Sequence, residues 1–494
     1  MSDKEREAEL LGIIAELTAT VNRLTDQITT IRAESNQQIA ELTRQVEELT
    51  AALQAKKTRK DSHNSSQPPS SDGYHKPNPK SLRTKSNKKA GGQPGHNGSG
   101  MAITREPDEE KKYLPEKCSG CPLAGKCQYS CAGTHYTYDL VVSTKLVAHK
   151  VMACNCPLEN GHEITGTFPK EASASKQYGP NLKAFVLTLL TLGYVSVDRT
   201  RQILEGLDIP ISSGTIQNIL DAGSKETTAA VDKIRDIVSS LKVIHCDETG
   251  VDINGKLNWL HCLCNPSWSY CVIHEKRGSK AMDEIGVIPS LEGSTLIHDF
   301  WSPYLKYSNV DHGFCNTHLE RELIYVNEST GQQWAMDLNN LLSEMCGNRN
   351  KLKAEGQTAF APDVLAKYYL KYDQLVNEGL EQNPIPTVAP GKRGRKAKGK
   401  TRCLLERLRD HRNEILRFAT DWEIPFTNNE AERCVRFSKV KEKVSGCFRT
   451  REGADGFMKL MSYIGTAKKH KVSAYDALLE AVTGNSLQLV NSWV

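Results

Sequence analysis

Two acidic residues stand at the ends of short apolar runs of the kind that form buried strands. Asp247 ends the run LKVIHCD, and Asp299 ends the run STLIHD. Between them, KLNWLHCLCN and SYCVIHEKRG favour two further strands around a turn at Pro266. Acids at strand ends often only cap the following turn, whereas two carboxylates that converge can share a divalent cation.

Three consecutive strands and a later fourth, with an acid at the end of the first and of the fourth, are the skeleton of a ribonuclease-H-like fold. In that fold the first and fourth strands are neighbours, so Asp247 and Asp299 are expected to converge. Their carboxylates would repel each other, and Mg²⁺ or Mn²⁺ would relieve that repulsion. Two such ions about 4 Å apart support phosphoryl transfer. A third acid is then expected.

Long strings in nearly the whole chain resemble the transposases of the insertion sequence 66 family. They are NSSQPPSSDG, GGQPGH, DETG, KRGSKAMDEIGVIP, HDFWSPYLKY, CNTHLERELIYV, NNEAERCVRFSKVKEKVSGCFRTREGA and MSYIGTAKKHKVSAYDAL. The resemblance implies a leucine-zipper-like N-terminus, a zinc-finger-like segment and a DDE catalytic domain, in that order. It also implies that the DDE acids are Asp247, Asp299 and Glu432.

The third acid has competitors. Glu430 and Glu432 are two residues apart on one expected helix, so they point to different faces, and periodicity does not say which face meets the metal ions. The NNxAER pattern, in which the Glu next to Arg433 recurs, favours Glu432. Glu248 and Glu322 are further candidates.

The length and composition predict a multidomain α/β protein. A chain of 494 residues corresponds to three or four domains of average size. Its fifteen cysteines and charged N-terminus, MSDKEREAEL, indicate a reducing compartment and no signal peptide. No apolar run approaches the roughly 20 residues that span a bilayer. We therefore expect a cytoplasmic, nucleoid-associated protein without membrane contact.

The first two segments differ sharply in character. Residues 5–56 predict a coiled coil, because apolar residues step by fours and threes through Leu10, Ile14, Leu17, Val21, Leu24, Ile28 and Ile31. The alternative is a lone amphipathic helix docked on its own chain. Residues 57–112 form a basic linker rich in Ser, Pro and Gly, which is either a DNA-contacting arm or only a flexible connection.

A cysteine cluster in residues 113–170 predicts a zinc-finger-like module. Cys118 and Cys121 form a CxxC knuckle, and Cys154 and Cys156 supply a second pair about thirty residues later. The segment between the pairs, Tyr136 to Met152, alternates like strands. Cys127, Cys131 and His162 are extra candidates, so the full ligand set stays open.

The remaining segments complete the expected order. Two short helices within residues 178–238 resemble a helix-turn-helix, although many helical hairpins bind nothing. The catalytic core is expected in residues 240–329 and 421–450, interrupted by a helical insertion in 330–420 and followed by a helical tail in 451–494. The insertion carries the basic block GKRGRKAKGKTR, which is either a hook for DNA or a solvated loop.

Basic residues near these elements are the expected DNA contacts. Those selected are Lys276, Arg277, Arg321, Lys392, Arg393, Arg395, Lys396, Arg433, Arg436 and Lys439, with Lys441 and Lys443 beside them. Cys315 and His318 could bind a metal ion, but with no second pair nearby in sequence we expect them to pack at the start of a helix.

Together these patterns predict a DNA transposase that cuts at the ends of its element and joins the freed 3′-hydroxyl to target DNA. Its partners are expected to be double-stranded DNA, a second copy of the chain or more, and possible companion proteins encoded by the element. The alternatives are a non-catalytic DNA-binding regulator and a nuclease of the same fold that hydrolyses without joining.

Overall fold

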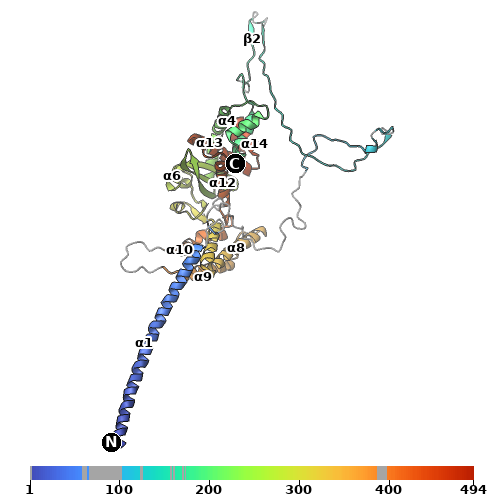
Figure 1. Cartoon of the computed structure of the whole chain (residues 1–494). Coiled ribbons are helices and arrows are strands. Elements are labelled where there is room, and N and C mark those ends of the chain that lie inside the picture. The colour runs from blue at the N-terminus through green and yellow to red at the C-terminus, as the bar shows by residue number, and fades with distance from the viewer. Residues whose placement is uncertain are drawn as a thin grey trace. The chain divides into compact units, whose positions relative to one another are not determined.

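The computed structural model of the chain describes residues 3–57, 64–65, 103–118, 120–122, 126–155, 158, 162–169, 172, 174–385 and 398–494. The chain divides into two compact units, and Figure 1 labels their elements. The larger unit comprises Met1–Pro79, Tyr178–Thr200 and Ser213–Val494, and the smaller unit comprises Lys80–Gln177 and Arg201–Ser212. Within the described residues, no helix is both long and apolar enough to span a membrane.

The larger unit contains a five-stranded sheet with the strand order β5-β4-β3-β6-β7. β3 pairs antiparallel with β4 and β4 with β5, whereas β6 runs parallel to β3 and β7 parallel to β6. The four predicted strands are present, and the first and fourth are neighbours as expected. The strands are β3 (Val243–Ile253), β4 (Lys256–Cys264), β5 (Ser269–His274), β6 (Thr295–His298) and β7 (Asp311–Phe314).

β7 was not predicted, because its four residues, DHGF, include an acid and a glycine and make no apolar run. The β3–β4 hairpin has a clear local cause. Ile253 pairs with Lys256 across a two-residue loop, and both loop residues, Asn254 and Gly255, have positive φ angles of 50° and 76°. Asn-Gly is the preferred sequence for such a turn, whose twist matches that of the strands.

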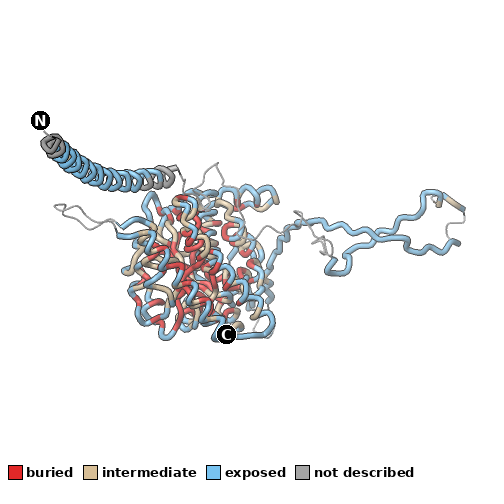
Figure 2. The backbone as a smooth tube through the Cα atoms, turned by 90° about the horizontal axis from the view of Figure 1, so that it is seen from below, coloured by how far each residue is buried: buried red, intermediate tan, exposed pale blue. Residues whose placement is uncertain are grey.

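Helices cover the sheet and surround it. α12 (Asn429–Ser445) packs on β3 and β4, and α13 (Arg451–Lys469) packs on β5. Figure 2 shows the buried residues gathered in the body of this unit. The other helices around α13 and the sheet are α2 (Pro180–Thr191), α4 (Ser213–Glu226), α5 (Thr228–Val238), α6 (Ser279–Ile285), α14 (Ala474–Val482) and α15 (Ser486–Asn491).

Side chains of α13 form hydrogen bonds with the backbone groups at the outer edge of β5. Ser269 N donates to Thr466 Oγ1 at 3.1 Å, and Cys271 N donates to Ser462 Oγ at 2.9 Å. Arg451 Nη2 donates to the carbonyl of Ile273 at 2.6 Å. An edge strand with unpaired backbone groups would otherwise be open to pairing with another chain. Residues 451–469, which the sequence predicted to be part of a C-terminal helical tail, thus pack against the sheet.

The expected helical insertion is present. α7 (Asn316–Thr330) leads into α8 (Gln333–Ala354), α9 (Pro362–Gln382), α10 (Lys400–Asp410) and α11 (Arg412–Thr420). These helices share an apolar core that includes the fully buried Trp334 and Leu405. At the opposite edge of the sheet, Arg417 of α11 donates to the carbonyl of His312 in β7, so the edge of this strand is also covered.

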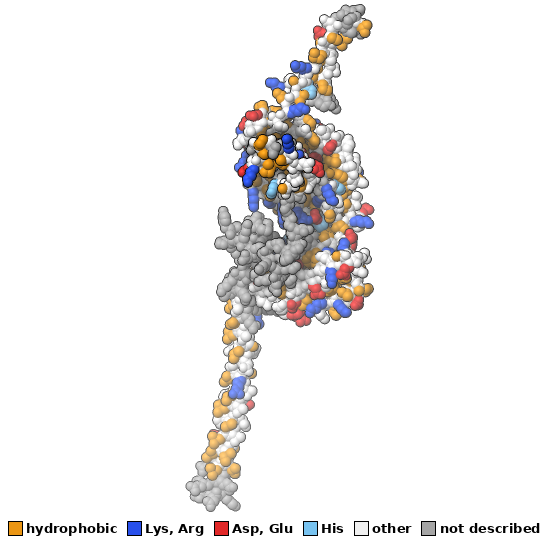
Figure 3. All heavy atoms as spheres, turned by 90° about the vertical axis from the view of Figure 1, so that its right-hand side faces the viewer, with side chains coloured by type: hydrophobic (Ala, Val, Ile, Leu, Met, Phe, Trp, Pro, Cys, Tyr) orange, Lys and Arg blue, Asp and Glu red, His pale blue; other side chains and the backbone are white. Residues whose placement is uncertain are grey.

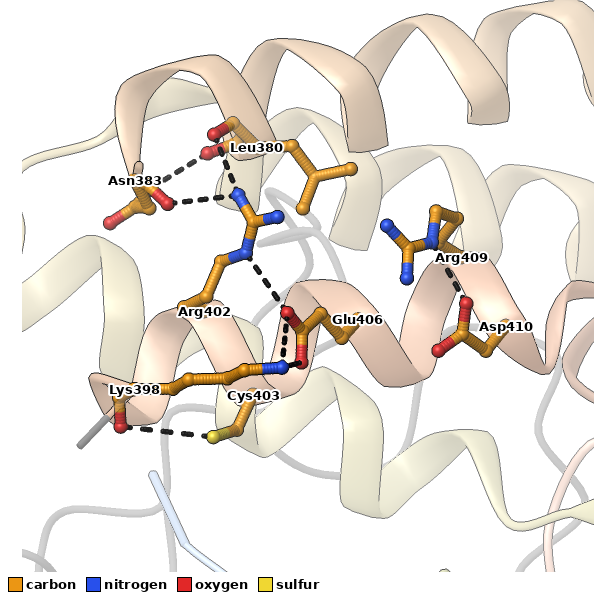
Figure 4. A network of polar contacts seen from close by, with 9 residues as sticks. Leu380, Asn383, Lys398, Arg402, Cys403, Glu406, Arg409 and Asp410 are labelled. Atoms are coloured by element: carbon orange, nitrogen blue, oxygen red, sulfur yellow. Dashed lines mark hydrogen bonds and ion pairs between the residues drawn. The ribbon is translucent and has the colours of Figure 1, made fainter. Parts of the chain in front are cut away.

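The basic block of the insertion is only partly described, because Lys392, Arg393, Arg395 and Lys396 lie outside the described residues. Two of its cations, Lys398 and Arg402, form internal contacts (Figure 4). Arg402 Nη1 donates to the carbonyls of Leu380 and Asn383 at 3.1 Å each, and Lys398 Nζ lies 2.7 Å from Glu406 Oε2. Arg402 thus joins α10 to the end of α9, whereas Lys398 binds Glu406 within α10.

The smaller unit contains little regular structure among its described residues. A 3₁₀ turn, η2 (Glu116–Cys118), and two short antiparallel strands, β1 (Ala153–Asn155) and β2 (Glu163–Thr165), are present. Tyr136 to Met152 form no strand, so that prediction is wrong. The alternation there has no partner strand to supply hydrogen bonds, and alternation alone does not stabilise a strand. The predicted helix pair is present as α3 (Val197–Glu205) and α4.

The N-terminal segment is one continuous helix, α1 (Asp3–Lys57). Its predicted apolar seam is exposed in the single chain, with Leu17 at 60% and Leu24 at 50% exposure. Figure 3 shows these hydrophobic side chains along the helix surface. After α1, Asn64 and Ser65 are buried, and Asn64 Nδ2 donates to Glu328 Oε2 of α7 at 3.0 Å. At these two residues the predicted linker is packed.

Candidate active site

The pairing of β3 and β6 explains how Asp247 and Asp299 come together. The two strands are parallel, and His245 is paired with Ile297. Asp247 and Asp299 each lie two residues beyond that pair. Because side chains alternate along a strand, residues at equal distances from a parallel pair lie on the same face and at the same level. The register thus brings both carboxylates to one end of the sheet.

The surroundings of Asp247 favour its neutral form. Burial is the largest cause that raises the pKa of this carboxyl well above its ordinary value, and the charges of Glu248, Asp299 and Glu432 act in the same direction. One backbone hydrogen bond, from Glu248 N to Asp247 Oδ1 at 2.9 Å, opposes the shift. Three acids from separate segments therefore act on one buried carboxyl.

Glu432 and Glu430 differ in their surroundings. Glu432 lies in the first turn of α12, with Oε1 4.0 Å from Cys315 Sγ and Oε2 3.7 Å from Arg436 Nη2. Glu430 instead pairs with Arg433 and lies 3.8 Å from Lys469 Nζ. Of the two, only Glu432 is among the charges that raise the pKa of Asp247.

The other two candidate acids are engaged elsewhere. Glu248 is adjacent to Asp247 on β3, so its side chain points to the opposite face of the sheet. Both of its carboxylate oxygens are occupied, since Oε1 accepts from Arg277 at 2.8 Å and Oε2 accepts from the Tyr304 hydroxyl at 2.6 Å. Glu322, on α7, pairs with Arg407 of α10.

Asn428 is a positioning residue that sequence reasoning missed. It is buried immediately before α12, and its Nδ2 donates to the carbonyl of Cys246 at 2.7 Å. Its Oδ1 accepts from His245 Nδ1 at 2.9 Å, and its backbone N donates to Cys315 Sγ at 3.2 Å. Asn428 therefore joins the start of α12 to β3. The available signal was an Asn at a helix start, where this residue is common.

Cys315 and His318 lie beside Glu432. Cys315 precedes α7 as expected of a residue at a helix start, and it is buried. Ligand atoms of Cys315, His318 and Glu432 lie within 4.8 Å of one another. The imidazole Nδ1 of His318 is buried without a hydrogen-bond partner. The sequence shows no further metal ligand near Cys315 and His318. In the fold, Glu432 of α12 supplies a third ligand atom beside them.

The predicted DNA contacts have different surroundings. Arg277 pairs with Glu248, and its guanidinium lies 4.1 Å from the Trp301 ring centroid and 4.8 Å from that of Trp259. Arg433 pairs with Glu430. Lys439 Nζ donates to the carbonyl of Gly250 and contacts Glu442. Exposed side chains remain at Lys276 and Arg436, and Arg321 is half-buried.

The predicted zinc ligands are not gathered in the described part of the smaller unit. Cys118 and Cys121 share a turn in which Cys121 N donates to the carbonyl of Cys118 at 3.3 Å. Cys154 lies on β1, and Cys156 is outside the described residues. Among the residues that are described, no group of three ligand atoms combines Cys154 with the Cys118–Cys121 knuckle. The zinc module stays a prediction.

The chemistry of the three predicted acids suits a divalent cation. Asp247, Asp299 and Glu432 offer hard oxygen donors, and Asp299 and Glu432 raise the pKa of Asp247 together with its burial. Among the described residues, the three acids do not form a group of ligand atoms within 4.8 Å, whereas Glu432 forms one with Cys315 and His318. A cation bound among them would favour the ionised carboxylates and offset that repulsion.

Comparison with known proteins identifies the family. The model of the IS66 family of transposases matches residues 175–456, which is more than half of the chain. The chain therefore belongs to this family of DNA-processing transposases. Residues 5–102 match a second family, DUF6444, whose function is unknown. No curated protein matches the sequence.

Proposed function

We propose that this transposase cuts DNA at the ends of its own insertion sequence and joins the freed 3′-hydroxyl to target DNA, with Asp247, Asp299 and Glu432 as the catalytic acids. The observation that carries the proposal is the parallel pairing of β3 with β6, whose register supports the convergence of Asp247 and Asp299 at one end of the sheet. The charges of Asp299, after β6, and of Glu432, on α12, also raise the pKa of Asp247.

The strand order supports a ribonuclease-H-like core of the DDE type. Three antiparallel strands, β3, β4 and β5, are extended by the parallel strands β6 and β7. Asp299 directly follows β6 as expected, whereas Asp247 lies within β3, which continues to Ile253 beyond the strand end expected from the sequence. In the proposed arrangement, the helical insertion from α8 to α11 separates Asp299 from Glu432 in the chain.

Asp247, Asp299 and Glu432 would hold Mg²⁺ or Mn²⁺. When bound, the cation lowers the barrier to in-line displacement at phosphorus by activating the attacking oxygen and stabilising the leaving oxygen. The chain's own contribution is to fix the acids. Trp301 N donates to Asp299 Oδ1 at 3.1 Å, Glu248 N donates to Asp247 Oδ1, and Asn428 fixes the start of α12. Arg436, close to Glu432 and mostly exposed, is suited to a phosphate.

The remaining modules supply recognition and assembly in this proposal. The helix pair α3 and α4 and the basic block around Lys392 to Lys396 bind double-stranded DNA. The α1 seam pairs two or more copies of the chain. Cys118, Cys121, Cys154 and Cys156 hold a structural zinc ion. The enzyme acts in the cytoplasm on nucleoid DNA, with companion proteins of the element as further partners.

The test compares cleavage, joining and binding in full-length variants. Asp247→Asn, Asp299→Asn and Glu432→Gln should each abolish cleavage of end DNA and leave its binding within a few fold, because each removes a metal-binding oxygen and no DNA-binding group. Glu430→Gln is the matched control, since its partners are Arg433 and Lys469, and it should retain cleavage.

Three results would contradict this proposal. Cleavage by the Glu432→Gln protein together with its loss in Glu430→Gln would move the third acid to Glu430. A wild-type protein that hydrolyses end DNA without joining it to a target would be a nuclease, and one that binds end DNA but never cuts it would be a regulator.

A further inference from the structure

Four cysteines of the larger unit lie at one face of its sheet, outside residues 113–170 of the predicted zinc module. They are Cys262 and Cys264 on β4, Cys271 on β5 and Cys434 on α12. Cys262 and Cys271 are direct cross-strand partners, and Cys262 and Cys264 are two residues apart on one strand. Both relations place side chains on the same sheet face. α12 packs on that face and supplies the fourth thiol.

Three of the four sulfur atoms have positions that suit a metal site. The Sγ atoms of Cys262, Cys271 and Cys434 all lie within 4.8 Å of one another, and those of Cys271 and Cys434 are 3.7 Å apart. A tetrahedral site with zinc–sulfur bonds of about 2.3 Å has sulfur–sulfur edges of about 3.8 Å. A disulfide needs about 2.05 Å. Cys264 is outside this group of three, but it lies two residues from Cys262 on the same face of β4 and acts electrostatically on Cys434, so it is a candidate for the fourth ligand.

The surroundings suit a closed structural site. Cys262, Cys264 and Cys271 are each at most 4% exposed, and Cys434 is partly buried, as suits a structural site rather than a substrate site. Four thiolates around one divalent cation carry a net charge of −2, which a nearby cation can offset. Lys469 of α13 acts electrostatically on both Cys264 and Cys434, and its Nζ is fixed by the carbonyls of Asn265 and Trp268.

We propose that Cys262, Cys264, Cys271 and Cys434 bind one structural Zn²⁺ that fastens α12 to strands β4 and β5. Binding releases the protons of the four thiols and changes no oxidation state. Cys434 lies two residues after Glu432, so the ion would fix the helix that presents this acid. The proposal does not depend on the identity of the catalytic acids.

The test first removes the other predicted zinc site. In the full-length chain, Cys118, Cys121, Cys127, Cys131, Cys154 and Cys156 are all replaced by Ser, and the protein is purified with its thiols protected. Elemental analysis should still find about one zinc ion per chain. Cobalt exchanged into this protein should show thiolate-to-metal charge transfer and the strong visible bands of tetrahedral cobalt. This measurement requires no change in the buried cluster.

Variants of the cluster then assign the ligands. In the same background, Cys271→Ser and Cys434→Ser should each lower the retained zinc at least ten-fold. Cys246→Ser is the matched control, because Cys246 is equally buried on the adjacent strand but points to the other face of the sheet, and it should retain the ion. Removing zinc should also speed amide hydrogen exchange in α12 more than in α9.

Three outcomes would overturn the proposal. The first is a background protein that retains no zinc and gives no thiolate–cobalt band. The second is zinc retained in full by both Cys271→Ser and Cys434→Ser. The third is a mapped disulfide between Cys271 and Cys434 in thiol-protected protein.

Discussion

Asp247 is the residue at which burial and like charge act together. Its pKa is raised by burial and by Glu248, Asp299 and Glu432. An acid whose folded-state pKa exceeds its unfolded-state value binds its proton more tightly in the folded protein. It therefore contributes stability that is fully present below the ordinary value of 3.8 and is lost as the pH rises through the raised value. A bound cation should restore that stability.

This gives a prediction for the metal-free protein. As the pH rises from about 4 to neutrality, ionisation of Asp247 should lower the melting temperature of the wild type. Asp247→Asn has no carboxyl to ionise at this position and should lack that decrease. At neutral pH without divalent ions, Asp247→Asn should melt at a higher temperature than the wild type. Added Mg²⁺ should raise the melting temperature of the wild type and leave that of Asp247→Asn nearly unchanged. Thermal unfolding followed by circular dichroism measures this.

The control is an exposed aspartate with the opposite perturbation. Asp410 accepts a hydrogen bond from Arg409, which lowers its pKa. Asp410→Asn should not raise the melting temperature at any pH. If both variants raise the melting temperature equally, or if Asp247→Asn does not raise it, then burial and neighbouring charges do not destabilise the ionised Asp247.

At the scale of elements, the position of α12 decides whether the third acid meets the other two. Asn428 joins the helix start to β3 through Cys246 and His245, and Cys315 accepts from its backbone N. Further along the same helix, Cys434 lies close to Cys262 of β4 and Cys271 of β5. Two separate attachments on one helix are expected to limit its rotation and sliding.

Asn428→Ala tests the first attachment. The substitution leaves the buried carbonyl of Cys246 without its donor, and such losses cost about 1–3 kcal/mol. We expect the free energy of unfolding in urea to fall by about that amount, and cleavage of end DNA to fall more than DNA binding. Asn429→Ala, at the adjacent exposed position, is the control and should change neither. Wild-type cleavage in Asn428→Ala would show that the helix is held without this residue.

At the scale of the molecule, α1 presents a long exposed apolar seam. Its apolar seam is about half exposed or more along its described length. Transposition requires two element ends to be held together, and pairing of two seams would bury these side chains while joining two catalytic units. The structure describes one chain, so pairing is a prediction.

Deleting residues 1–56 should weaken self-association and paired-end joining, while binding to a single end survives. A finer variant, Leu17→Asn with Leu24→Asn, should weaken association similarly, and the control Thr18→Asn with Thr25→Asn, one position along the helix, should not. Light scattering measures each mass. A truncated protein that stays dimeric at low micromolar concentration would place the interface elsewhere. A monomeric full-length protein would mean that DNA ends drive assembly.

The sequence by itself determined the features that depend on local pattern. The strands that carry Asp247 and precede Asp299, the long seam of α1 and the helices of the insertion are encoded in periods of two or about three and a half residues. The alternation from Tyr136 to Met152 led to a wrong prediction of strands. A strand also needs a partner strand, and the sequence pattern does not show whether one is available.

Only the tertiary structure decided which groups meet. Glu432 is among the charges that raise the pKa of Asp247, Glu430 pairs with Arg433, and Glu248 pairs with Arg277. Cys271 and Cys434 are 163 residues apart in sequence and 3.7 Å apart in the fold. Periodicity gives the face of a residue on its own element, whereas such contacts depend on how separate elements pack.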